Sequence, residues 1–233
     1  MPSEYLTIPE ELAAANLAIE NGITNVQIRP LLEGVGYTLG KMEIGRGRYQ
    51  RASALTVTQT SEHGQQHGAT DGKNTAWDEA IEVYMSDLKL ARLAIKGRGD
   101  RDRMLLDGDR KDSYAGRKAQ ADQFYTVAIQ DAALQTQLLE VNLTLAKLQA
   151  HQTLIDTAEE ARLAQANEKG EAEDSTEARD AALAELRAWM HDYIAAAHVA
   201  LQDHPQLLEA LGIVARSGAA APKADPTPPT PVS

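Results

Sequence analysis

The chain has 233 residues, of which 43% are hydrophobic but only 4% aromatic, so its apolar content is mainly alanine and leucine. This composition favours helices, because both residues lose little side-chain freedom in a helix. A formal net charge of -11 disfavours general nucleic-acid binding. The absence of cysteine excludes disulfides, thiolate metal sites and cysteine nucleophiles.

The N-terminal sequence has no basic region leading into an apolar run, and no stretch of about 18 apolar residues occurs in the chain. We therefore expect a cytoplasmic protein without membrane insertion, and leave export by another route open.

The first expected element is a helix over residues 9–20. Pro9 suits the first turn of a helix, and Asn21-Gly22 is typical of a helix end. A long helix is expected over residues 31–60, although each of its glycines weakens it by up to about 1 kcal/mol relative to alanine. The segment 54–58 also fits a strand; we favour the helix.

The polar run 61–75, with its Asp71-Gly72 turn signal, predicts a loop. Thr75 then indicates a helix start. Apolar residues follow at alternating spacings of four and three, which places them on one face of that helix. These residues are Trp77, Ile81, Tyr84, Leu88, Ala91 and Ile95. Gly97 ends the helix, and residues 100–113 are expected to form a short helix and a connector.

A heptad-like apolar stripe predicts one helix over about residues 113–167, which would be about 80 Å long. The polar segment 168–174 is expected to form a turn before the next helix. A short apolar helix is expected over residues 206–214. Beyond residue 216 the chain is rich in proline and alanine, which predicts an extended tail.

The two halves of the chain resemble each other. Segment 31–42 is followed by a similar segment at 138–148, and 84–87 is matched by 189–192. The matching segments keep an offset of about 105 to 107 residues, which is typical of an internal repeat. The sequence therefore predicts a duplication.

We predict a mainly α protein: an elongated four-helix bundle built from two duplicated helical hairpins, with an extra N-terminal helix and an extended Pro-rich C-terminal tail. The N-terminal helix and its connector correspond to residues 1–30. The first hairpin repeat is expected at 31–112, the second at 113–215, and the tail at 216–233.

The sequence predicts no catalytic residue, no metal ligand and no cofactor. His63 and His67 would share a helical face, but Gly64 between them indicates a loop. The Glu-x-x-His motif of di-iron bundles does not occur. The remaining histidines on or near the last helix are more typical of packing or interface positions. These are His191, His198 and His204.

Two groups of residues are candidates for contacts with other chains. Arg46, Arg48 and Arg51 form a basic cluster that could hold a phosphate or an acidic partner, or pair with carboxylates on an adjacent helix or a neighbouring copy. The second group is the apolar face of the short C-terminal helix. Its members are Leu207, Leu208 and Leu211.

We therefore expect a non-enzymatic structural or scaffold protein that acts by self-association into a homo-oligomer or filament. An alternative is a helical adaptor that binds another protein through its short C-terminal helix or its Pro-rich tail. A third hypothesis is an enzyme or metal protein that uses His63, His67 or the histidines of the last helix.

Overall fold

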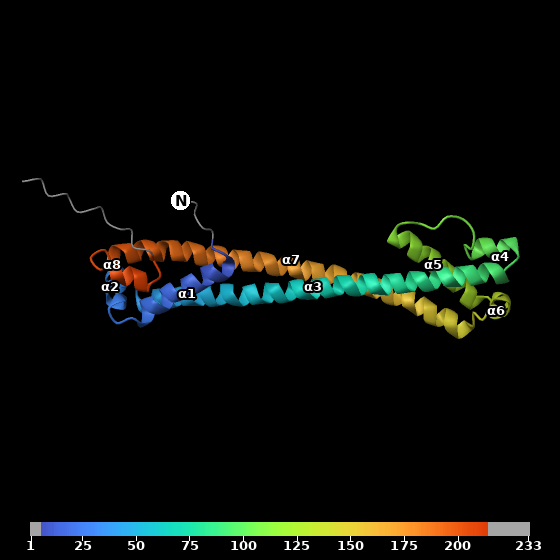
Figure 1. Cartoon of the computed structure of the whole chain (residues 1–233), viewed down its shortest axis with the longest axis horizontal. Helices are drawn as coiled ribbons and strands as arrows, with labels where there is room; N and C mark the ends of the chain where they lie inside the picture. Colours follow the sequence, from blue (N-terminus) through green and yellow to red (C-terminus); the bar gives the residue numbers. More distant parts are fainter. Residues whose placement is uncertain (1–5, 214–233) are drawn as a thin grey trace, which may run out of the picture. The chain divides into compact units, whose positions relative to one another are not determined.

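The computed structural model describes residues 6–213. Of these residues, 83% are helical and none forms a strand, so the prediction of a mainly α protein is confirmed. The predicted tail, residues 216–233, lies outside the described residues. Figure 1 follows the helices of this part of the chain. They are α1 (Ile8–Thr24), α2 (Ile28–Gly34), α3 (Leu39–Ala94), α4 (Arg98–Arg103), α5 (Tyr114–Gln130), α6 (Ala132–Leu139), α7 (Leu145–Ala200) and α8 (Pro205–Ala210).

The chain forms two compact units. Among the described residues, unit 1 contains 6–56 and 179–213, and therefore α1, α2, α8, the beginning of α3 and the end of α7. Unit 2, residues 57–178, contains α4, α5, α6 and the remaining parts of α3 and α7. Each compact unit thus combines segments from both halves of the sequence.

Unit 1 begins with a capped helix. The Glu10 carboxylate accepts hydrogen bonds from the Thr7 backbone N–H at 2.8 Å and from the Thr7 hydroxyl at 2.7 Å, which satisfies a backbone donor at the helix start. Pro9 lies in the first turn of α1, as predicted. The helix continues past the predicted Asn21-Gly22 end to Thr24.

Aromatic rings from α7 form the centre of the unit 1 core. Trp189 and Tyr193 are stacked, with ring centroids 5.0 Å apart. Tyr37 contacts both rings edge-on. The buried Tyr193 hydroxyl donates a hydrogen bond to the carbonyl oxygen of Ala18 at 2.9 Å, so α1 and α7 are joined by both apolar burial and a satisfied polar group.

A second aromatic cluster forms the centre of unit 2. Phe124 and Tyr125 of α5 lie edge to face, with ring centroids 5.0 Å apart, and Tyr84 of α3 contacts both. Four members of the predicted apolar stripe, at the end of α3 and directly after it, are buried in this unit, as the spacing indicated. They are Tyr84, Leu88, Ala91 and Ile95.

The predicted loop at 61–75 and the predicted turn at 168–174 are both wrong, because both segments are helical within α3 and α7. The two hairpins are therefore not formed as predicted. Ala172, in the expected turn, is only 2% exposed. Burial of such a side chain stabilises the helix where its sequence is polar. Each glycine destabilises the helix by only about 1 kcal/mol relative to alanine.

The predicted helix at 113–167 is also wrong, because this segment is divided among α5, α6 and α7. The Asp131 carboxylate caps α6 by accepting hydrogen bonds from the backbone N–H groups of Ala133 at 3.0 Å and Leu134 at 3.2 Å. Between α6 and α7, Asn142 has a φ of 60° and turns the chain. The predicted helix at 31–60 is divided in the same way between α2 and α3, at Gly36.

Replacing Gly64, Gly68 and Gly72 together by alanine should raise the free energy of unfolding by about 1.5–3 kcal/mol, since each helical glycine costs about 0.5–1 kcal/mol. A Cβ added at any of the three would meet nothing within 4 Å. Urea denaturation measures the change. Gly45→Ala is the matched control: its Cβ would collide with the Trp189 ring, so this variant should lose about 1–3 kcal/mol. Destabilisation by the triple variant would contradict an exposed helix at 64–72.

Candidate functional site

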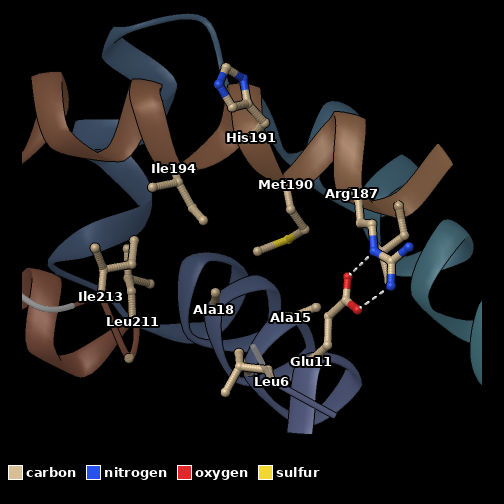
Figure 2. A pocket seen from close by; sticks show the side chains of 13 residues that line it. Leu6, Glu11, Ala15, Ala18, Arg187, Met190, His191, Ile194, Leu211 and Ile213 are labelled. Carbon is tan, nitrogen blue, oxygen red and sulfur yellow. Dashed lines mark hydrogen bonds and ion pairs between the residues drawn. The ribbon is translucent and has the colours of Figure 1, made fainter. Parts of the chain in front are cut away.

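An apolar groove of about 320 Å³ lies in unit 1 between α1, the end of α7 and the segment that follows α8 (Figure 2). Small side chains of α1 line one side of it, and longer side chains of α7 line the other. The lining residues are Leu6, Glu11, Ala14, Ala15, Ala18, Leu186, Arg187, Met190, His191, Ile194, Leu211, Gly212 and Ile213.

Residue size and one tight turn shape the groove. Met190 and Ile194 of α7 point toward α1, which carries only alanines at the facing positions (Figure 2). Gly212 has a φ of 72°, a conformation that favours glycine. The turn places the Ile213 N–H 3.0 Å from the Leu208 carbonyl oxygen, which accepts its hydrogen bond. Ile213 and Leu211 thereby lie at one end of the groove.

A bidentate ion pair lies at the other end. Arg187 donates from Nε and Nη2 to the two carboxylate oxygens of Glu11, at 2.6 and 2.7 Å. These hydrogen bonds raise the pKa of the Arg187 guanidinium above its usual value. Because both charges at this end are paired, the groove favours small apolar side chains over a charged ligand.

The predicted arginine cluster is paired inside unit 1. Arg46 donates from Nε and Nη2 to the Glu20 carboxylate at 2.7 and 2.8 Å. Arg48 donates to the carbonyl oxygen of Glu185 at 3.0 Å, and Arg51 lies 3.5 Å from the Glu185 carboxylate. These contacts correspond to the alternative in which the cluster pairs with groups on an adjacent helix.

The predicted leucines, which lie on α8 and directly after it, pack in the core of unit 1. Leu208 is 5% exposed and Leu211 is 1% exposed, while Leu207 is partly buried against the same core. Burial of these side chains attaches α8 to α1 and α7. The described structure therefore presents them inward, as structural contacts.

The histidines of the sequence prediction lie on or beside helices. His63, which was expected in a loop, is on α3, and its Nε2 is 3.4 Å from the Thr176 hydroxyl of α7. His67 is exposed on the same helix. His191 lines the groove. His198 and His204 are exposed.

Three carboxylates gather in unit 2. Glu62 of α3 and Glu168 and Glu171 of α7 place carboxylate oxygens within 4.8 Å of one another. Such a set of oxygens is the kind that hard cations bind. Glu171 is exposed and the other two are half-buried. Exposed acidic groups often occur together without an ion, so this cluster alone assigns no ligand.

A buried carboxylate that the sequence interpretation missed lies in unit 2. Asp87 is 3% exposed. Its Oδ2 accepts a hydrogen bond from the Tyr125 hydroxyl at 3.0 Å and lies 2.6 Å from His151 Nδ1. Burial, and then the adjacent carboxylate, raise the pKa of Tyr125, so the hydroxyl stays protonated and remains a donor. This network links α3, α5 and α7.

The spacing of the sequence contained a signal for this buried carboxylate. Asp87 lies between Tyr84 and Leu88 on the apolar face of its helix, and Ala91 continues that face one turn later. A carboxylate on an apolar face needs a hydrogen-bond partner. The partners, Tyr125 and His151, come from distant segments and could be found only from the tertiary structure.

Tyr125→Phe should lower the free energy of unfolding by about 1–3 kcal/mol, because it removes a donor from a buried carboxylate. Chemical denaturation of Tyr125→Phe, Asp87→Asn and the double variant would measure the coupling. The effect of Tyr125→Phe should shrink in the Asp87→Asn background, where no charge needs the donor. Equal effects in both backgrounds would contradict a hydrogen bond to the carboxylate.

Stability should also depend on pH through Glu159. Arg162 donates to its two carboxylate oxygens at 2.8 and 2.9 Å, and these hydrogen bonds lower the pKa of Glu159 from 4.5 to about 2. The contribution is fully present above pH 4.5 and is lost as the pH falls toward 2. Glu159→Gln should therefore cost about 0.5–1 kcal/mol at pH 7 and less at pH 3. In an Arg162→Gln background the same substitution should show a smaller pH dependence, because only Tyr114 and Lys118 then lower the pKa of Glu159. Urea midpoints at both pH values test this.

No helix of the described residues is long and apolar enough to cross a membrane. Comparisons with protein-family models, with curated proteins and with solved structures found no match to this chain.

Proposed function

We propose that the protein is a non-enzymatic structural protein that acts by self-association into a homo-oligomer or filament. The observation that supports this proposal is a set of exposed apolar side chains that recur at matching positions of the two halves of the chain.

The proposal includes an internal duplication, with helices α1 to α4 corresponding to α5 to α8; the N-terminal helix, which the sequence pattern predicts outside the repeat, is thus included in the first half. Helices α1 and α5 each have 17 residues, and α3 and α7 each have 56. Both pairs begin 106 positions apart. The turns before α3 and α7 match as well: Gly36 and Asn142, again 106 positions apart, both have positive φ.

Three pairs of large apolar residues are exposed at positions 106 apart. Exposed fractions are 63% and 61% for Leu93 and Val199, 69% and 50% for Val57 and Leu163, and 42% and 39% for Leu39 and Leu145. A single exposed apolar residue needs no explanation. The two halves differ at most other positions, but both have a large exposed apolar residue at these three. This match favours a contact outside the monomer.

A second copy of the chain is the partner that we propose for these residues. Each chain carries the same kind of exposed apolar position in both of its units, so one copy offers at least two attachment points. Heterologous contacts between such points generate rings or filaments. Apolar burial would supply the free energy, at about 25 cal/mol per Å².

The adaptor alternative receives less support. Its docking element was the short C-terminal helix, but Leu208 and Leu211 are buried in unit 1. The other docking element, the Pro-rich tail, lies outside the described residues.

Self-association predicts that the weight-average mass rises with concentration above the 25.2 kDa of one chain. Leu93→Glu with Val199→Glu should shift the equilibrium toward the monomer, because a charge at each position opposes apolar burial. Analytical ultracentrifugation over a wide range of concentrations measures both effects.

The matched control is Ser86→Glu with Ala195→Glu. It adds the same charge at exposed positions of α3 and α7 without removing a large apolar side chain. This control should associate like the natural chain. A natural chain that stays monomeric at every concentration would overturn the proposal, as would equal effects of the two double variants.

A further inference from the structure

The surface of unit 2 that corresponds to the groove of unit 1 is covered by a connecting segment of the chain. Between α4 and α5, residues 104–113 connect the two helices. Arg110 of this connector donates to the Tyr84 hydroxyl of α3 at 3.0 Å. A hollow of about 130 Å³, smaller than the groove of unit 1, lies beside Tyr84 and Arg110.

Two residues of α5 hold the same connector. Gln120 donates from Nε2 to the carbonyl oxygen of Asp109 at 3.1 Å and accepts from the Lys111 N–H at 3.0 Å. Arg117 donates from Nε to the Lys111 carbonyl oxygen at 2.8 Å. The connector therefore lies beside the first turns of α5 and is held there by polar contacts from Arg117 and Gln120.

The residues that hold the connector correspond to residues that line the open groove. With the offset of 106, Tyr84 corresponds to Met190, Arg117 to Glu11 and Gln120 to Ala14. All three counterparts line the groove of unit 1. This correspondence uses the internal duplication proposed above, and it does not depend on self-association.

The chain also arrives at both places in the same way. Leu106 donates its N–H to the Arg101 carbonyl oxygen at 2.9 Å, and Ile213 donates its N–H to Leu208 at 3.0 Å. The connector follows the first of these turns. The segment that begins at Val214 follows the second.

The composition of each segment matches the surface it would meet. The connector reads DGDRKDS over residues 107–113, and it meets polar partners. The segment 214–220 reads VARSGAA, and the groove beside it is lined by Ala14, Met190 and Ile194. From Ala18 to Glu11 the groove follows α1 for about 10 Å, a distance that about three to four extended residues span.

We propose that the segment beginning at Val214 binds in the groove of unit 1, where it covers Ala14 and Met190 as the connector covers their counterparts in unit 2. The ligand of the groove is thus a segment of the same chain that begins with Val214 and Ala215 and is rich in small residues, with Arg216 as the one charged residue of 214–220. Such an intramolecular contact needs little intrinsic affinity, because the attachment at Ile213 keeps the segment at a high local concentration.

Single cysteines test the proposal directly, because the chain has none of its own. Ala13 and Ala14 are neighbouring exposed residues of α1, but only Ala14 lines the groove. In the full chain, the thiol of Ala14→Cys should be alkylated about 10-fold more slowly than that of Ala13→Cys, which corresponds to a groove covered in about nine molecules of ten.

Substitutions within the full chain identify the segment that covers the groove. Adding Val214→Asp and Ala215→Asp should raise the alkylation rate of Ala14→Cys about 10-fold, while Thr227→Asp with Thr230→Asp should leave it unchanged. Equal rates at positions 13 and 14 would overturn the proposal. Protection that survives Val214→Asp and Ala215→Asp would overturn it too, because another segment would then cover the groove. Protection that disappears on dilution would assign the groove to a second copy.

Discussion

Burial of one face of each long helix is the constraint on which the other features depend. In unit 1 the beginning of α3 and the end of α7 share one core, and in unit 2 the end of α3 and the beginning of α7 share another. A helix satisfies its own backbone hydrogen bonds, so its polar middle can continue as a helix when its ends are packed. The short helices then cover the apolar surface that α3 and α7 leave in each unit.

Corresponding positions of the two units have acquired different chemistry. Asp87 of unit 2 and Tyr193 of unit 1 lie 106 positions apart, and both are buried. His151, which faces Asp87, corresponds to Gly45, against which the Trp189 ring packs. At these corresponding positions unit 2 thus has a buried polar network, and unit 1 has stacked aromatic rings. The backbone arrangement that the two units share does not require a shared set of side-chain interactions.

The two proposed contact surfaces differ in whether their side chains are alike in the two halves of the chain. The groove of unit 1 is apolar because alanine and methionine occupy positions where unit 2 has glutamine and tyrosine. The exposed apolar pairs, in contrast, keep their character in both halves. A contact between copies would use the exposed apolar residues that both halves have. A contact with the chain's own C-terminal segment would use the groove residues, which differ between the halves. The two contacts involve different residues, so each can fail without the other.

Local patterns in the sequence determined the helical class, the start of α1 near Pro9 and the buried stripe from Tyr84 to Ile95, because periodicity and helix-end residues act over a few positions. The continuity of α3 through Gly64 and Gly72, in contrast, was decided by tertiary structure. Glycine and polar residues weaken a helix by an amount that packing elsewhere along it can offset, and no local pattern reports that packing. The groove and the Asp87 network were likewise decided only by the fold, since each brings together side chains from segments far apart in the chain.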